Sequence, residues 1–79
     1  MASYSLQFRK SVAKDLLSIP NQHVARILER IQALVEQPRP AGSEKLASQN
    51  RYRIRQGGYR IIYEIRDREL IVVVVKSGG

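Results

Sequence analysis

The first half of the chain changes from a strand-like to a helix-like spacing of apolar positions. Residues 3–9 alternate apolar and polar side chains, which predicts a half-buried strand. Apolar side chains then recur every three or four residues, which predicts two amphipathic helices. The first covers about residues 11–18 with Ser11 as its N-cap, and the second runs from an Asn21 N-cap to a stop at Pro38.

The second half of the chain returns to strand-like patterns. Residues 38–42 are rich in turn formers, and residues 43–50 are ambiguous. From Arg51 onward, three strands are predicted, with a two-residue turn at Gly57-Gly58 between the first two and the last at residues 69–76. The apolar run in that last strand indicates a central place in the sheet.

These elements define an α+β fold of order βααβββ. A helical hairpin is expected to pack on one face of a small, mainly antiparallel, four-stranded sheet. The length of 79 residues allows one domain, so residues 1–79 are predicted to form a single unit.

The Gly57-Gly58 turn also predicts which strand positions share a face. If these two residues form the whole loop, Arg55 lies opposite Arg60 and Ile54 opposite Ile61. The core face then carries Tyr52, Ile54, Tyr59, Ile61, Tyr63, Ile65, Leu70, Val72 and Val74. The opposite face carries Arg51, Arg53, Arg55 and Arg60 around Ile62, Glu64, Ile71, Val73 and Val75.

The predicted pair of Arg55 and Arg60 has a functional implication. Like charges directly opposed across two strands destabilise a sheet by roughly 0.2–1 kcal/mol, so selection for stability alone disfavours them. Guanidinium groups bind phosphate oxygens bidentately and stay charged at physiological pH. The pattern therefore favours a phosphate-binding surface, and the alternative is a solvated strand face.

Composition narrows the classes of function. The formal net charge of +7 is consistent with a polyanionic partner and also with charge that serves solubility. The chain has no Cys and a single His, so no disulfide, thiolate or His-rich metal site is expected, and no cofactor is predicted. No apolar run is long enough to cross a bilayer, which predicts a cytoplasmic protein without a membrane partner.

Other candidate residues have plainer interpretations. His23, in the first turn of the second helix, is expected to be an exposed surface residue rather than a catalytic base. Tyr52, Tyr59 and Tyr63 fall on the predicted core face, so packing is expected rather than stacking on nucleic-acid bases. No paired carboxylates, phosphate loop or Ser/His/Asp set is present, so a conventional hydrolase site is absent.

The strand region contains two motifs, Tyr52-Arg53-Ile54-Arg55 and Gly58-Tyr59-Arg60-Ile61-Ile62-Tyr63-Glu64-Ile65. They resemble motifs of the RelE/ParE toxins of bacterial toxin–antitoxin systems, closer to the RelE branch. The resemblance implies a ribosome-dependent endoribonuclease that enters the 30S A site, cuts mRNA there and blocks translation. It implies catalytic roles for Arg53, Arg55 and Arg60, with Lys45 and Arg51 adding affinity for the RNA backbone.

The resemblance carries further expectations. Its members bind a cognate antitoxin through an acidic and apolar segment. Their pattern continues past the last strand with a basic pair and a terminal Tyr, whereas this sequence ends at Lys76-Ser77-Gly78-Gly79, which implies a shortened and weakened or inactive form. A ParE-like inhibitor of DNA gyrase that performs no chemistry, and a generic nucleic-acid-binding module, remain the alternatives.

Overall fold

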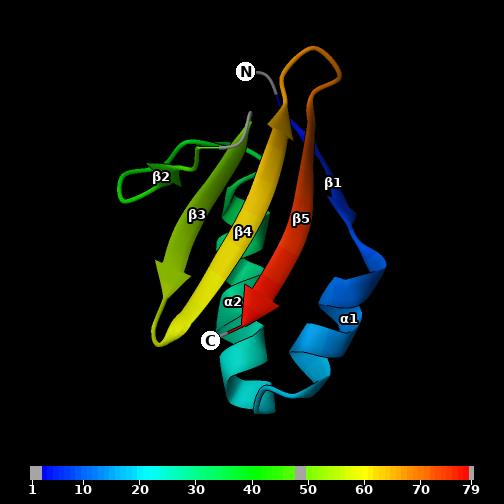
Figure 1. The fold of residues 1–79 in the computed structure, drawn as a ribbon, viewed down its shortest axis with the longest axis vertical. Helices are drawn as coiled ribbons and strands as arrows, with labels where there is room; N and C mark the ends of the chain where they lie inside the picture. Colours follow the sequence, from blue (N-terminus) through cyan, green and yellow to red (C-terminus); the bar gives the residue numbers. More distant parts are fainter. Residues whose placement is uncertain (1–2, 48–49, 79) are drawn as a thin grey trace.

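The computed structural model describes residues 3–47 and 50–78 of the chain. Along the described chain, the elements are β1 (Ser5–Phe8), α1 (Lys10–Leu17), α2 (Asn21–Ala33), β2 (Glu44–Lys45), β3 (Arg51–Gln56), β4 (Tyr59–Arg66) and β5 (Ile71–Gly78) (Figure 1). The predicted order of strand, two helices and three long strands is confirmed. The ambiguous stretch before Arg51 contributes the additional strand β2.

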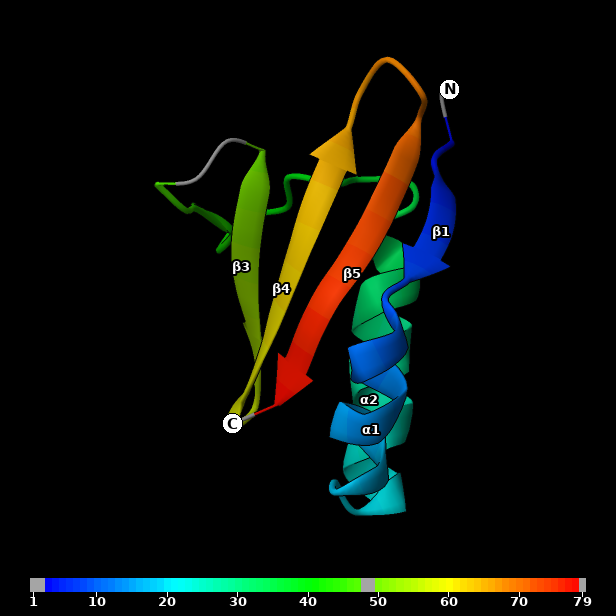
Figure 2. The ribbon, with the colours of Figure 1, turned by 45° about the vertical axis from the view of Figure 1, so that its right-hand side comes forward.

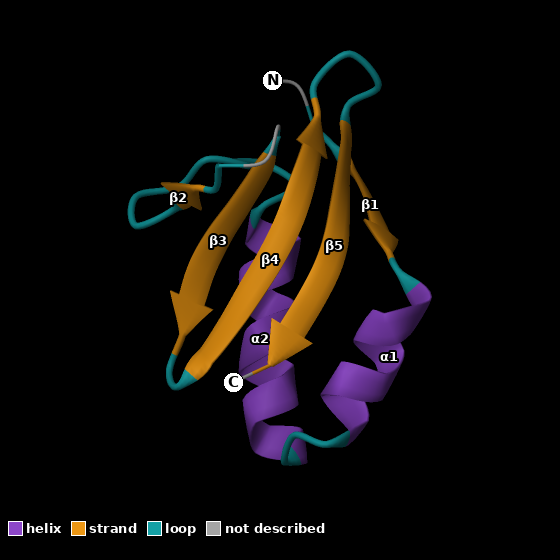
Figure 3. Ribbon diagram, in the orientation of Figure 1, coloured by secondary structure: helices purple, strands orange, loops and turns teal. Residues whose placement is uncertain are grey.

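The strands form a five-stranded sheet in the order β1-β5-β4-β3-β2. Strand β1 pairs with β5 in parallel, and all other pairs are antiparallel (Figure 3). The α+β class and the central place of β5 are therefore confirmed, while the prediction of four strands missed β2. Two residues are too short a segment to produce an alternating pattern in the sequence.

Both helices cover the same face of the sheet (Figure 2). Helix α1 packs against β5, and α2 packs against β3. The core between these layers consists of Val12, Ile19, Ile27, Ile31, Leu34, Ile54, Ile61, Tyr63, Ile65, Val72 and Val74. Burial of each large apolar side chain contributes about 1.5–3 kcal/mol, so this layer holds the fold together. Within the described residues, no helix is long and apolar enough to span a membrane.

The helix starts differ from the predicted ones. Helix α1 begins one residue before Ser11, with Arg9 at the N-cap position, and Pro20 rather than Asn21 occupies the N-cap of α2. Neither cap makes a side-chain hydrogen bond. Packing of the apolar stripe on the sheet fixes these helices more than local capping does, so a polar residue near the start is a poor guide to the cap.

The β3–β4 hairpin has the predicted register. Arg55 pairs with Arg60, Ile54 with Ile61, and Tyr52 with Tyr63. Gly57 has a φ of +61°, a conformation that glycine adopts without the steric cost of a Cβ atom. The turn therefore sets the register, and the register decides which side chains point away from the helices.

Strand β5 departs from the expected alternation at both ends. Leu70, predicted on the core face, lies in the preceding turn with a φ of 55° and is 41% exposed. Near the other end, a bulge shifts the pairing, so that Tyr63 faces Val74 while Ile62 faces Lys76. Val75 is the extra residue of this bulge, and uninterrupted alternation would have placed Lys76 on the core face.

Candidate nucleic-acid interface

The sheet surface that faces away from the helices carries most of the candidate residues, and we name it the outer face. Strand pairing places on it Glu44 of β2, Arg51, Arg53 and Arg55 of β3, Arg60, Ile62, Glu64 and Arg66 of β4, and Ile71, Val73 and Lys76 of β5. The predicted platform of cations around an apolar floor is therefore present. Its cations divide into two groups according to their ionic partners.

At one end, the cations are matched by carboxylates. Glu64 lies 3.6 Å from Nε of Arg51 and 3.2 Å from Nε of Arg66, and Arg66 also reaches Glu69 at 3.7 Å. We name this group the Glu64 end. Its positive charges are largely neutralised by neighbours in the sheet, so they attract a distant polyanion weakly.

At the other end, beside the Gly57-Gly58 turn, Arg55 and Arg60 face each other across the hairpin, and Lys76 lies on the next strand. We name these three residues the turn end. None of them has a carboxylate within 4.0 Å among residues 3–47 and 50–78. Both guanidinium groups are exposed, so they can bind an anion from solution.

Arg53 lies between these two groups and is less available. Its Nη2 donates to Glu44 at 3.1 Å, and its side chain is 26% exposed. Its Nε is buried and has no acceptor in the described part of the chain. The short strand β2 thus fixes Arg53 in place through Glu44, and this partner must be displaced or shared before Arg53 binds phosphate fully.

Lys45 does not join the cations of the outer face. It pairs with Tyr52, a residue of the core face, so it lies on the helix side of the sheet edge. The structure therefore separates Lys45 from Arg51, Arg53, Arg55 and Arg60, with which the sequence grouped it.

Lys76 is one of two outer-face cations that the sequence analysis did not place there, the other being Arg66. The bulge turns Lys76 outward and turns its neighbour Ser77 into the core, where Ser77 is fully buried. The backbone N–H of Ser77 donates to Asp15 of α1 at 3.3 Å, which ties the end of β5 to the helix layer. The sequence contains a signal for this bulge, because Lys76 falls at a position where the alternation through Val72 and Val74 requires an apolar residue.

The tyrosines lie on the helix side of the sheet, as predicted. Tyr63 is fully buried, its hydroxyl donates to the carbonyl of Pro38 at 2.6 Å, and its ring stacks on Tyr52 with centroids 5.9 Å apart. Burial raises the pKa of Tyr63 to about 12. These rings therefore serve the core. His23 is half-buried rather than exposed, because its ring packs 5.4 Å from that of Tyr59.

A polar network around Asp67 lies beyond the Glu64 end of the sheet. Asp67 accepts hydrogen bonds from Arg39 at 2.9 Å and from the Tyr4 hydroxyl at 2.8 Å, and Arg39 also donates to the hydroxyl of Tyr52. The hydrogen bond from Arg39, followed by that from Tyr4, lowers the pKa of Asp67. This network is structural, since it joins the residue before β1, the segment after α2, strand β3 and the β4–β5 turn.

Comparison with known proteins gives one matching family and several solved structures with the same fold. The family described as ParE toxin of type II toxin-antitoxin system, parDE, matches residues 6–78. No curated protein sequence matches the chain. The archaeal RelE–RelB complex from Pyrococcus horikoshii OT3 contains a chain with 30% identity and a TM-score of 0.87, covering 98% of this chain and 94% of that one.

Two further solved structures share the fold. The toxin–antitoxin complex RelBE2 from Mycobacterium tuberculosis has 24% identity and a TM-score of 0.85, with 98% of each chain covered. The intact E. coli RelBE toxin–antitoxin complex has 23% identity and a TM-score of 0.85, covering 98% of this chain and 96% of that one. The fold and the family match together define a toxin of a toxin–antitoxin system. The chain belongs to the RelE/ParE toxin family.

Proposed function

We propose that this protein is a RelE-like toxin that cuts mRNA on the ribosome and thereby blocks translation. The observation that carries the proposal is the turn end, where two opposed arginines and Lys76 have no carboxylate partner in the described residues. Opposed like charges cost the sheet stability, which is understandable if an anion supplies the missing partner. The resemblance of the strand motifs to RelE toxins, together with the fold shared with the 30% identical RelE chain, supports the choice of RNA as that anion.

The turn end suits the chemistry of RNA cleavage without a metal ion. In this reaction the 2′-hydroxyl gives its proton to water and its oxygen attacks the adjacent phosphorus, so that negative charge grows on the phosphoryl oxygens. The bond to the 5′-oxygen then breaks, that oxygen takes up a proton from water, and a 2′,3′-cyclic phosphate remains. Arg55 and Arg60 can hold those oxygens through bidentate hydrogen bonds and stabilise the growing charge. Residues 3–47 and 50–78 contain no group of three His, Asp or Glu side chains that could hold a metal ion.

The cations of the outer face have different roles in this proposal. An arginine keeps its proton in proteins, so Arg55 and Arg60 act by charge and orientation rather than as bases. Lys76 carries a compact ammonium group that adds charge to the same phosphate. Arg53 is placed to share its guanidinium between Glu44 and the RNA, and Arg51 contributes long-range attraction that Glu64 reduces.

The proposal includes an antitoxin partner. The solved structures with this fold include toxin–antitoxin complexes, among them those from Pyrococcus horikoshii and E. coli. An antitoxin segment with carboxylates would supply at the turn end the partners that the sheet lacks there. It would then compete with RNA for the same arginines, and the antitoxin would thereby inhibit the toxin.

A translation assay with mapped cleavage tests the proposal. The protein is added to a purified translation system, and mRNA ends are mapped by primer extension with and without ribosomes. We expect cuts in ribosome-bound mRNA that depend on Arg60. Intact mRNA at toxin concentrations equal to those of the ribosomes would contradict the proposal, as would unchanged cutting by the Arg60→Ala variant.

A second candidate function is inhibition of DNA gyrase. It is favoured by the family match, since the family that covers residues 6–78 is described as ParE toxin. It is also favoured by the lack of His and of unpaired carboxylates on the described outer face, which suits binding better than proton transfer. Loss of gyrase supercoiling in the presence of the protein, with ribosomal mRNA left intact, would establish this function instead.

A further inference from the structure

A second group of cations lines a groove on the helix side of the sheet. Two adjoining hollows of about 420 and 680 Å³ lie between α2 and the end of β3, and they share Gln22, Arg26 and Gln56. We name them together the α2–β3 groove. Beyond these three residues, its walls include His23, Arg30 and Tyr59.

The charges in this groove are not balanced locally. Arg26 and Arg30 lie one helical turn apart, and neither has a carboxylate within 4.0 Å in the described residues, although Glu29 is between them in the sequence. Like charges at this spacing destabilise a helix by about 0.2–0.5 kcal/mol. The pair is therefore not explained by the stability of α2, and it repeats the pattern of Arg55 and Arg60.

The Arg30 side chain is held by packing rather than by an ion pair. Its Nε is buried and has no acceptor among the described residues, and the residue as a whole is half-buried. Its side chain thus packs against neighbours, and the outer part of its guanidinium lines the groove. A guanidinium group that is already ordered loses little entropy when it binds an anion.

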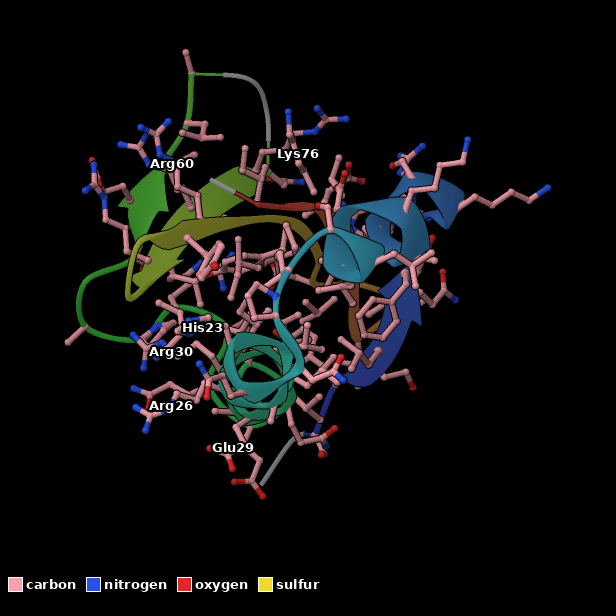
Figure 4. All side chains as sticks on the ribbon, turned by 90° about the horizontal axis from the view of Figure 1, so that it is seen from below. His23, Arg26, Glu29, Arg30, Arg60 and Lys76 are labelled. Atoms are coloured by element: carbon pink, nitrogen blue, oxygen red, sulfur yellow. The ribbon has the colours of Figure 1, made fainter. Side chains whose placement is uncertain are left out.

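The groove and the turn end lie on two sides of the same hairpin tip. Gln56, which lines the groove, directly follows Arg55, and Tyr59, which also lines it, directly precedes Arg60. Figure 4 shows that His23, Arg26 and Arg30 extend from α2 to the side of the molecule where Arg60 lies. Glu29 also lines the second hollow, but its side chain points away from the sheet. An anionic chain can therefore pass from one set of cations to the other around the tip.

We propose that the α2–β3 groove is a second binding site for the RNA backbone, which holds the strand after it passes around the hairpin tip. This extension rests on the proposed function, because it assigns the path of the same substrate. The guanidinium groups of Arg26 and Arg30 bind successive phosphates, and the amides of Gln22 and Gln56 offer hydrogen bonds to sugars or bases.

The lining favours a nucleic acid over an acidic peptide. A docked amphipathic helix needs large apolar pockets for its anchor residues, but the groove offers only Ala25, Ala33 and the half-buried ring of Tyr59. Charge and amide groups dominate its surface, and these are the groups that contact sugar and phosphate.

The salt dependence of RNA binding tests this site without ribosomes. A labelled single-stranded RNA of about 20 nucleotides is titrated with the wild-type protein and with the double variant Arg26→Gln/Arg30→Gln at several salt concentrations. Each phosphate contact to single-stranded RNA contributes about 0.7 to the slope of log K against log salt. We expect the slope to fall by about 1.4, which corresponds to about 25-fold weaker binding at 0.1 M salt.

Two controls keep the test specific. The variant Lys10→Gln/Lys14→Gln removes the same charge from positions one turn apart on α1, away from the groove, and should leave the slope nearly unchanged. The variant Arg26→Lys/Arg30→Lys keeps the charge and should retain most of the slope. Thermal unfolding of each variant reports whether the fold is intact.

The outcomes separate this site from the proposed function. An unchanged slope in the folded Arg26→Gln/Arg30→Gln variant overturns the groove as an RNA site, as does an equal loss in the α1 variant. If the Arg26→Gln/Arg30→Gln variant keeps RNA binding but loses affinity for an antitoxin, the groove binds an acidic protein segment. That result also overturns the proposal of an RNA site. A lowered slope together with uncut ribosomal mRNA retains the groove and rejects the endoribonuclease.

Discussion

The two ends of the outer face carry the same kind of residue in opposite electrostatic settings. At the Glu64 end, Arg51 and Arg66 share a carboxylate within 3.6 Å. At the turn end, Arg55 and Arg60 oppose each other, and no carboxylate of the described residues approaches them within 4.0 Å. These four arginines belong to one hairpin, β3–β4, with one continuous register, so the difference between them lies in the placement of the acidic residues.

This difference distinguishes the charges that stabilise the fold from those that are available to bind an anion. A matched arginine contributes modestly to stability and attracts little from solution. An unmatched pair costs stability and creates a strong local field, which suits a surface that meets a polyanion. A count of basic residues gives both ends equal weight, whereas the strand pairing and the ion pairs distinguish them.

The largest expected effect is the contrast between Arg60→Ala and Arg66→Ala. Under the proposed function, Arg60→Ala should slow ribosome-dependent mRNA cleavage about 10²–10³-fold, because it removes a donor aimed at the developing charge. Arg66→Ala should change the rate little, since its charge is already matched by Glu64 and Glu69. Single-turnover cleavage rates measure both, and similar losses at the two ends would remove the distinction.

A second prediction is that the Glu64 end binds RNA as the turn end does once its carboxylate is removed. Glu64→Gln frees Arg51 and leaves Arg66 with only its longer contact to Glu69, so the affinity for single-stranded RNA should rise and the salt slope should steepen by about 0.7. Fluorescence anisotropy over a salt series measures the slope. A slope equal to that of the wild type would mean that pairing with Glu64 does not mask these arginines.

A third prediction concerns the stability cost of the turn end. Arg55→Thr removes the like-charge pair with Arg60 and places a β-branched residue in a strand, so the free energy of unfolding should rise by about 0.2–1 kcal/mol. Urea denaturation measures this gain. The same variant should cut mRNA more slowly than the wild type, and a variant that is both less stable and less active would indicate a structural role for Arg55.

The smallest effect is expected at Asp67, beyond the Glu64 end. Because Arg39 and Tyr4 lower its pKa in the folded state, Asp67 stabilises the fold above its unfolded pKa of about 3.9 and loses this contribution as the pH falls through the lowered value. The difference in urea midpoint between wild type and Asp67→Asn should therefore be present at pH 7 and shrink at pH 3. A difference that is independent of pH would point to packing instead.

The hairpin was predictable because its determinants are local. Gly57-Gly58 restricts the loop to two residues, and the alternation of Tyr52 to Tyr63 then leaves one register that buries the apolar side chains. The opposed pair of Arg55 and Arg60 follows from that register directly. The sequence alone therefore places Arg55 and Arg60 opposite each other on one face.

The remaining features depend on contacts between distant segments. Glu44 is drawn to Arg53 by the pairing of β2 with β3, which no local pattern marks. Lys76 reaches the outer face through a bulge that accommodates burial of Ser77 against α1. The α2–β3 groove forms only when α2 packs against β3, so the shared role of Arg26 and Gln56 could not be read from their separation of 30 positions in the sequence.

The central claim is that RNA binds the unmatched arginines and not the matched ones. The most direct measurement is a titration of the ¹⁵N-labelled protein with single-stranded RNA, followed by NMR through the Nε–H signals of the arginine side chains. The claim predicts that the Arg55 and Arg60 signals shift with increasing RNA while those of Arg51 and Arg66 remain in place. Shifts of equal size at both ends, or larger shifts at Arg51 and Arg66, would contradict it.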